Sequence, residues 1–332
     1  MIKILTVCPN PPDAASFYRG YGPLNDLMKN HGDVFIENGE GKVFDWSNMS
    51  RYNILFLQRP FLEQHAAMAE FAKRFNIKVW LDHDDNVLDV PKDNPANKHY
   101  DKEKVRANIK LCLQYADLIT VSTPFLKQLF EGYGGNNIHV VPNALNTDFF
   151  GNMNQPKLNN IVLWRGSNTH FMDYKTVADT INKMAFRGHN LYIIGGECKD
   201  KHNDVRNLIR REYMHQPAID VIKYHRLIRD LRPRFIFVPL VINDFNRGKS
   251  NIAWMEAAWA GGATLATYMD EWIRPGITNY YDTEDFKEKF ELLLTNDEYL
   301  IEKVKESQRH IKKHLTLNKT NRLRYKLLRS IL

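Results

Sequence analysis

The chain has 332 residues, 43% of them hydrophobic and 26% charged, and its three cysteines are too few for a disulfide framework or a cysteine-based zinc site. The length allows two domains of ordinary size, and the composition excludes a disordered tail. The formal net charge of +7 favours an anionic partner, and the lack of a long apolar run or an export signal leads us to expect a cytoplasmic protein.

In the first half, short apolar runs alternate with amphipathic segments of helical length, which is typical of a parallel sheet covered by helices. Strands are predicted at 2–7, 54–57, 78–81, 118–121 and 139–141. Helices are predicted at 22–30, 62–75, 102–115 and 124–133, the last with Thr123 as its N-cap. We therefore expect a Rossmann-like N-terminal domain over residues 1–145.

Turn-forming residues then gather in 146–158, which we predict to be a linker. The alternation restarts with strands predicted at 160–165, 191–194, 219–222, 235–239 and 263–267. Helices are predicted at 174–186, 204–213, 223–231, 252–260, 283–294 and 297–315. This pattern predicts a second Rossmann-like domain over 159–300. Two such domains bind ligands in the cleft between them, because parallel sheets bind at the carboxyl ends of their strands.

The final segment, 301–332, is rich in lysine and arginine, and its leucines are spaced as in an amphipathic helix. A basic helix of this kind suits an anionic partner, either DNA or a membrane surface. A solvated helix face, packed on the fold through its leucines, explains the same pattern.

A loop with a cation and a hydroxyl, Lys249 and Ser250, stands directly before the helix predicted at 252–260. The start of a helix attracts phosphate, because its first N–H groups are unpaired and its dipole is positive there. Glu256 lies further along the same helix, where its carboxylate can accept hydrogen bonds from a ribose diol. An ordinary surface turn before a buried helix explains this stretch equally well when it is taken alone.

A second candidate loop follows the strand at 160–165. Arg165 ends that strand, Gly166 lets backbone N–H groups approach a phosphate, and Ser167 adds a hydroxyl. Lys249 belongs to another loop at the same edge of the predicted sheet, so the two cations together can neutralise a leaving diphosphate without a metal ion. His170 can donate to the diphosphate or to a sugar hydroxyl. A purely structural turn is the alternative.

Acidic residues follow the strand predicted at 78–81. Carboxylates at the end of a strand can act as a general base, and neighbouring carboxylates raise one another's proton affinity. Asp84 and Asp85 are our catalytic candidates for activating an acceptor hydroxyl, with His83 third. A turn-forming acidic loop is the alternative, and we predict no protein metal site. After the first strand, Tyr18 and Arg19 are candidates for contacts to the sugar or the acceptor.

Five groups of residues occur in this order along the chain: 117–123, 140–146, 165–170, Phe245 with Asn246, and Lys249-Ser250 with Glu256. In that order they resemble the landmarks of the GT-B fold glycosyltransferases. The nearest resemblance is to the family 4-like set, which includes bacterial and bacteriophage members.

The resemblance implies a GT-B fold: two Rossmann-like α/β domains with doubly wound parallel sheets, facing across a cleft, and a C-terminal helix that crosses back to the first domain. It also implies a hexosyl- or pentosyltransferase that uses a nucleotide-sugar, with UDP-sugars favoured. Arg165 and Lys249 would contact the diphosphate, together with Gly166, Ser167 and Ser250. Glu256 would contact the ribose, and Asn246 the sugar or acceptor. No cofactor is expected, beyond weak stimulation by a divalent cation.

One departure from the family pattern affects the mechanism. The pattern has a glutamate eight positions before Glu256, where this chain has Gly248. That glutamate is tied to sugar contact and to the retaining mechanism, so the donor sugar and the stereochemistry stay open. An inverting displacement with Asp84 or Asp85 as the base is our hypothesis.

Four interpretations of the function remain. The favoured acceptor is a hydroxymethylated base of phage DNA, modified in the host cytoplasm. The first alternative is a cell-surface polysaccharide or a lipid-linked glycan at a membrane. The others are a non-catalytic nucleotide- or sugar-binding protein and a nucleotide-sugar epimerase. The oligomeric state is not predicted.

Overall fold

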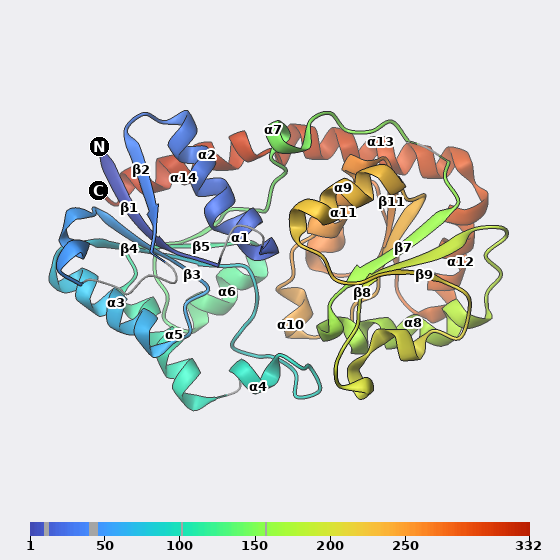
Figure 1. Cartoon of the computed structure of the whole chain (residues 1–332), viewed down its shortest axis with the longest axis horizontal. Coiled ribbons are helices and arrows are strands. Elements are labelled where there is room, and N and C mark those ends of the chain that lie inside the picture. The colour runs from blue at the N-terminus through green and yellow to red at the C-terminus, as the bar shows by residue number, and fades with distance from the viewer. Residues whose placement is uncertain (10–12, 40–45, 101, 157) are drawn as a thin grey trace.

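The computed structural model describes residues 1–9, 13–39, 46–100, 102–156 and 158–332. Within these ranges the chain forms two parallel six-stranded sheets that lie side by side, each covered by helices (Figure 1). Both termini lie beside the first sheet, so the chain returns to the domain in which it began. Residue 157, in the predicted linker, is outside the described residues.

The first sheet has the strand order β2-β1-β3-β4-β5-β6, and all of its pairs are parallel. Its strands are β1 (Ile2–Val7), β2 (Val34–Asn38), β3 (Ile54–Gln58), β4 (Lys78–His83), β5 (Leu118–Val121) and β6 (Ile138–Val140). The helices are α1 (Ala14–Arg19), α2 (Tyr21–Asn30), α3 (Glu63–Arg74), α4 (Asn97–Tyr100), α5 (Glu103–Tyr115) and α6 (Pro124–Gly132). The central strands are mostly buried and apolar, as expected for a sheet covered on both faces.

The second sheet has the order β12-β11-β10-β7-β8-β9. Its strands are β7 (Ile161–Gly166), β8 (Asn190–Gly195), β9 (Met214–Gln216), β10 (Phe235–Val238), β11 (Ala263–Thr267) and β12 (Ile277–Tyr280). The helices are α8 (Phe171–Lys183), α9 (Val221–Leu231), α10 (Asp244–Arg247), α11 (Ile252–Ala260), α12 (Thr283–Thr295) and α13 (Asp297–His314). A short helix, α7 (Thr147–Phe150), lies between the two domains. The predicted two-domain, doubly wound architecture is therefore confirmed.

Two predicted elements are wrong. The run 219–222 is not a strand but the start of α9, because the Asp220 carboxylate accepts a hydrogen bond from the Lys223 N–H at 2.9 Å and caps the helix. The predicted helix 204–213 ends after the 3-10 turn Val205–Leu208. There the Asn182 side chain bonds the backbone on both sides of the break, accepting from the Arg210 N–H at 2.8 Å and donating to the Leu208 carbonyl at 2.8 Å.

The sequence pattern also does not predict β2, β9 or β12, since all three are short strands at a sheet edge. Edge strands carry a weaker apolar signal than central ones, because one side lacks a partner strand.

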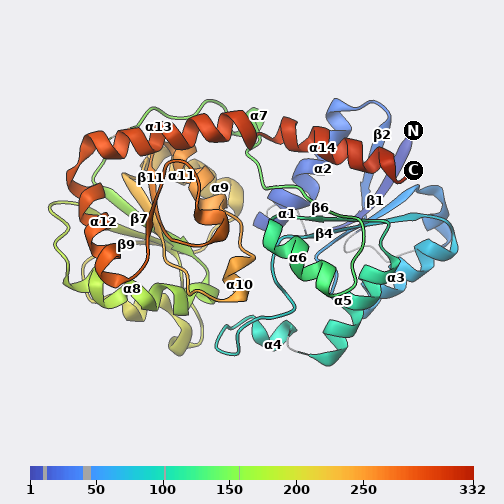
Figure 2. The same cartoon turned by 180° about the vertical axis from the view of Figure 1, so that it is seen from behind.

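The C-terminal segment crosses back as expected, but as two helices (Figure 2). α13 packs on α11, and α14 (Leu317–Ser330) runs on to α2, where Asn321 donates to the Pro23 carbonyl at 2.9 Å. The break between them pairs with the other crossing segment: Leu145 donates to the Leu315 carbonyl at 2.9 Å, and Leu317 donates to the Leu145 carbonyl at 2.8 Å. The two connections between the domains therefore lie side by side. Among the residues that the structure describes, no helix is long and apolar enough to cross a membrane.

Candidate active site

A cleft of about 560 Å³ lies between the two domains. The first domain contributes residues of α1 and the loops after β3 and β4. The second contributes the carboxyl ends of β7, β8 and β10 and the beginning of α11. This is the edge at which parallel α/β sheets bind ligands.

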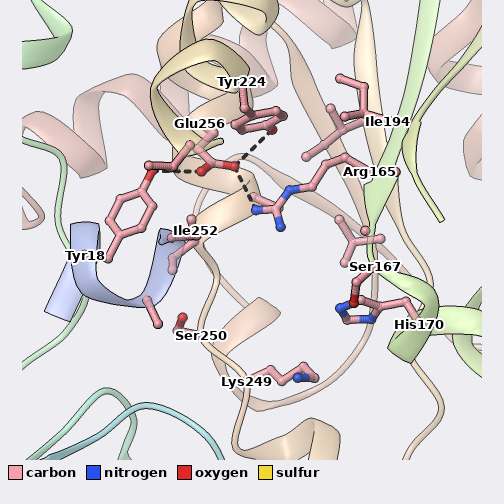
Figure 3. Close-up of a pocket in the computed structure, with 18 of the residues that line it drawn as sticks. Tyr18, Arg165, Ser167, His170, Ile194, Tyr224, Lys249, Ser250, Ile252 and Glu256 are labelled. Atoms are coloured by element: carbon pink, nitrogen blue, oxygen red, sulfur yellow. Dashed lines mark hydrogen bonds and ion pairs between the residues drawn. The ribbon is translucent and has the colours of Figure 1, made fainter. Parts of the chain in front are cut away.

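One wall of the cleft is built around the Glu256 carboxylate, which accepts hydrogen bonds from three side chains (Figure 3). Arg165 Nη2 lies 2.7 Å from Oε2, the Tyr224 hydroxyl donates to Oε2 at 3.1 Å, and the Tyr18 hydroxyl donates to Oε1 at 2.8 Å. Tyr18 comes from the first domain, so this carboxylate also joins the two domains. The Tyr18 hydroxyl lies 3.2 Å from His225 Nε2 as well.

Burial determines the protonation states of this cluster. Burial and the nearby Glu256 carboxylate raise the pKa of both Tyr18 and Tyr224 well above the ordinary value, so both phenols keep their protons and donate. Burial alone lowers the pKa of the Arg165 guanidinium, but Glu256 and the two tyrosines raise it above its ordinary value. Arg165 is therefore a permanent cation at the cleft wall.

The position of Glu256 follows from the composition of α11. The helix is apolar around nearly its whole surface, and Glu256 itself is only 2% exposed. Its end is fixed by Gly261 at φ 89°, where a Cβ would lie 2.6 Å from the Gln155 carbonyl oxygen. A fully buried helix cannot slide without losing these contacts, so the carboxylate is held rigidly.

The opposite wall carries a chain of charges that joins the domains. Arg59 Nη2 lies 2.8 Å from Asp84 Oδ1 and 3.1 Å from Asp85 Oδ2. Asp85 Oδ1 in turn lies 3.3 Å from Lys249 Nζ in the second domain. The predicted diphosphate ligand Lys249 is thus paired with one of the predicted catalytic carboxylates.

The two adjacent aspartates have opposite pKa shifts. Burial raises the pKa of Asp84, Arg59 opposes this, and the neighbouring Asp85 charge adds to the increase. Burial also acts to raise the pKa of Asp85, but Lys249 and Arg59 lower it below its ordinary value. Two neighbouring carboxyl groups whose pKa values are shifted in opposite directions are typical of sites that perform acid–base chemistry.

A third polar group consists of His170 and Asp173 at the start of α8. His170 Nδ1 lies 2.8 Å from Asp173 Oδ2, and the imidazole lines the cleft. Asp173 Oδ1 accepts from Asn246 Nδ2 at 2.7 Å and from the Val241 N–H at 2.8 Å.

Ten of the thirteen predicted site residues line this one cleft: Tyr18, Asp84, Asp85, Arg165, Gly166, Ser167, His170, Lys249, Ser250 and Glu256. Ser250 also accepts a hydrogen bond from Asn143 of the first domain at 2.7 Å. Within the described residues, no group of three or more His, Cys, Asp or Glu side chains is arranged to hold a metal ion.

The other three predicted residues lie outside the cleft. His83 ends β4 and stacks on Phe130 at 4.3 Å, and burial lowers its pKa to about 4. Arg19 follows Tyr18 by about 100° around α1, so it faces the sheet instead and pairs with Asp82 at 2.7 Å. Asn246 is 3% exposed, and its side-chain amide donates a hydrogen bond to Asp173. For these three the expected location was wrong.

Arg59, Tyr224 and Asp173 belong to the site although the sequence analysis does not select them. Arg59 directly follows β3, so the strand-end signal that selects Asp84 could also have found it. Tyr224 lies on a helix, and nothing local in the sequence shows that it faces the cleft. Asp173 does not line the cleft but bonds His170, three residues before it.

The glycine that departs from the family pattern lies where the domains touch. A Cβ on Gly248 would lie 3.0 Å from Leu126 Cδ2 and 3.3 Å from Asn86 Cβ, both in the first domain. Thr123 of the same domain donates to the Gly248 carbonyl at 3.4 Å. A side chain at this position would therefore begin in tight contact with the first domain.

This packing predicts that Gly248→Glu weakens the fold and does not restore a functional glutamate. Because the side chain must displace Leu126 or separate the domains, we expect the free energy of unfolding to fall by about 1–3 kcal/mol, the usual cost of overpacking. Denaturant unfolding measures the change, with Gly248→Ala as the smaller matched control. Unchanged stability of the glutamate variant would contradict this account of the interface.

No known protein family and no curated protein matches the sequence. Among solved structures, sucrose-phosphate synthase from Thermosynechococcus elongatus is similar with a TM-score of 0.75 at 11% identity, covering 100% of this chain and 99% of that one. HepE of Anabaena in complex with UDP has a TM-score of 0.72 at 11% identity, covering 99% and 100%. The chain has the GT-B fold.

The GT-B fold also relates the chain to a second kind of protein. UDP-GlcNAc 2-epimerase from Neisseria meningitidis bound to UDP-GlcNAc has a TM-score of 0.57 at 11% identity, covering 99% of this chain and 100% of that one. At these identities the similarity shows the fold alone. Membership of the family 4-like set and a bacteriophage source stay predictions.

Proposed function

We propose that the chain is a glycosyltransferase that moves a sugar from a nucleotide-diphosphate sugar, with UDP-sugars favoured, to an acceptor hydroxyl. The observation that carries the proposal is the pairing of two chemistries across one cleft. Arg165 and Lys249 supply cations at the carboxyl edge of the second sheet, and Asp84 and Asp85 supply carboxylates from the first domain. The similar HepE structures with UDP and UDP-glucose support this choice of donor.

The donor would bind to the second domain. Gly195, Ala218 and Ile219 line an apolar part of the cleft that suits a flat nucleobase. Glu256 already accepts three hydrogen bonds, and a carboxylate has about four acceptor sites, so one remains for a ribose hydroxyl. The diphosphate would lie by Arg165 and replace Asp85 as the partner of Lys249.

Asp84 is the better of the two candidates for the base. Its raised pKa brings its proton affinity closer to that of a base used near neutral pH, whereas Asp85 is held ionised by Lys249. In an inverting displacement, Asp84 takes the proton of the acceptor hydroxyl as that oxygen attacks the anomeric carbon. The nucleoside diphosphate leaves with the electron pair of the broken C–O bond.

The first experiment is a panel of UDP-, GDP- and other nucleotide-sugars tested by thermal shift, followed by transfer assays with the donor that stabilises most. We expect a UDP-sugar to raise the melting temperature and an inverted product anomer by NMR coupling. Chelation with EDTA tests the prediction that no metal is required. A retained anomer would exclude the simple base role, and no stabilisation by any nucleotide-sugar would exclude the proposed function.

For the acceptor, we propose hydroxymethylated bases of DNA as the first class to test. The support is an exposed row of cations along the crossing helices, consisting of Lys305, Arg309, Lys312, Lys313, Lys319, Arg322, Lys326 and Arg329. Such a surface would bind phosphates with a steep salt dependence. Anionic membranes that carry a lipid-linked glycan fit the same charges, so both acceptors are assayed, by mass gain on DNA and by transfer to lipid-linked sugar.

A nucleotide-sugar epimerase is a second candidate, because the similarity to the Neisseria meningitidis epimerase extends over 99% of this chain. An epimerase converts the donor with no acceptor present, which separates it from a transferase. A non-catalytic binding protein would bind the nucleotide-sugar without any turnover.

A further inference from the structure

His170 and Asp173 form a hydrogen-bonded pair of which only the histidine reaches the cleft. The two side chains are three residues apart at the start of α8, with 24% of the imidazole exposed but only 7% of the carboxylate. The buried carboxylate is held by three donors, namely His170, the Asn246 amide and the Val241 N–H. This arrangement fixes the direction of the imidazole, as a carboxylate behind a functional histidine generally does.

The pair also determines which nitrogen carries the proton. Burial acts to raise the pKa of Asp173, but its bonds to His170 and to the Val241 N–H lower it below the ordinary value, so the carboxylate is ionised and can only accept. The proton between them therefore sits on His170 Nδ1. Nε2 is left as the ring nitrogen available to the cleft.

The surroundings of His170 suit a phosphate. The imidazole lies beside Ser167 in the pocket that also contains Arg165 and Lys249 (Figure 3). Gly166 leaves the room for it, since a Cβ there would lie 3.2 Å from His170 Cδ2. Titratable groups of other elements that interact electrostatically with this pair include Asp85 across the cleft, Lys249 and Tyr280.

We propose that His170 takes up one proton when the donor diphosphate binds, and that Asp173 positions it to do so; the inference rests on the proposed function. A neutral imidazole with Nδ1–H directed at Asp173 presents only a lone pair to the phosphate oxygens, which are themselves acceptors. The imidazolium instead donates Nε2–H to a phosphate oxygen. One solvent proton is added to Nε2, and no bond of the donor breaks in this step.

The charges of the cleft explain why an added proton is useful. Arg165 is paired with Glu256, and Lys249 with Asp85, so both cations are already balanced by carboxylates before the donor arrives. The diphosphate brings two further negative charges. Protonation of His170 supplies a further cation beside the diphosphate.

The test is calorimetric titration of the full chain with UDP-glucose in buffers of different ionisation enthalpy, because its diphosphate does not itself titrate near neutral pH. The dependence of the binding enthalpy on the buffer gives the number of protons taken up. We expect net uptake by the unmodified chain and, in the alkaline range, a loss of affinity of up to about tenfold per pH unit.

Two variants and a control complete the experiment. His170→Gln should bind UDP-glucose more weakly and without proton uptake, and Asp173→Asn should reduce the uptake because the imidazole is no longer fixed. His189→Gln, which alters a histidine bonded to the Phe186 carbonyl outside the cleft lining, should leave uptake unchanged.

Binding of UDP-glucose without net uptake, or uptake that persists in His170→Gln, would overturn the inference and leave the proposed function standing. Failure of every nucleotide-sugar to bind would instead refute the proposed function, and the inference with it.

Discussion

Asp84→Asn is expected to lower kcat for sugar transfer by about 10²–10⁴-fold, the usual contribution of a positioned general base. Asparagine has nearly the same size and can still face Arg59, but it cannot take the proton of the acceptor hydroxyl. Since Asp84 lies in the first domain, we expect the affinity for UDP-glucose to change little. Steady-state kinetics and calorimetry measure the two effects separately.

The pH dependence gives a second readout for Asp84. The base works only when ionised, so kcat/KM should rise with pH through the pKa of Asp84. Burial raises that pKa, so the acid limb of the profile should lie above the ordinary range of an aspartate. In Asp84→Asn this limb should disappear.

Asp85→Asn is the matched control, because it removes an adjacent carboxylate of the same size. Its partner is Lys249 at 3.3 Å, so its loss frees that cation for the diphosphate. We therefore expect UDP-glucose to bind at least as tightly as before, and kcat to fall less than in Asp84→Asn. If Asp85→Asn is the more damaging change, the assignment of the base is reversed.

The fold could be predicted from the sequence because each central strand is an apolar run followed by an amphipathic helix, and this signal is local. The errors occur where the local signal has two explanations or is weak. The apolar residues around Asp220 read as a strand, but the carboxylate caps a helix that begins there. The edge strands β2, β9 and β12 carry too little apolar signal to be found.

The location of the candidate site could be predicted for the same reason. Loops at the carboxyl ends of parallel strands meet at one edge of each sheet. The loop edges of the two sheets face the same cleft, which brings Arg165 and Lys249 of one domain and Asp84 of the other together although they are far apart in the chain. Their roles stay predictions. Side-chain direction could not be predicted, because neighbours on α1 diverge: Tyr18 reaches Glu256 while Arg19 turns into the sheet to pair with Asp82.

Contacts between separate elements also could not be predicted from the sequence. Tyr224 reaches Glu256 from α9, and Asp173 of α8 is held by the Asn246 amide and the Val241 N–H, which belong to other segments. Each depends on how elements pack in three dimensions, which no local spacing specifies. The same holds for Gly248, since only the three-dimensional structure shows that it packs against the first domain.

Arg165→Ala should affect both donor binding and folding. Loss of a charge-assisted bond to the diphosphate is expected to weaken UDP-glucose binding by about tenfold to a hundredfold. The change also leaves Glu256 buried without its cation, which costs stability. Since 29% of the Arg165 side chain is exposed, we expect a loss of only about 2 kcal/mol in the free energy of unfolding, below the cost for a fully buried pair.

The double variant Arg165→Ala with Glu256→Gln separates these two effects. A neutral amide no longer needs a cation. Its carbonyl oxygen can accept from one of the two tyrosine hydroxyls and its NH2 can donate to the oxygen of the other, so denaturant unfolding should show most of the lost stability restored. Binding of UDP-glucose should stay weak, because the charge that meets the diphosphate is still absent. If the double variant instead recovers donor affinity together with stability, Arg165 serves only to neutralise Glu256, and the diphosphate must be held by Lys249 and the loop beside it.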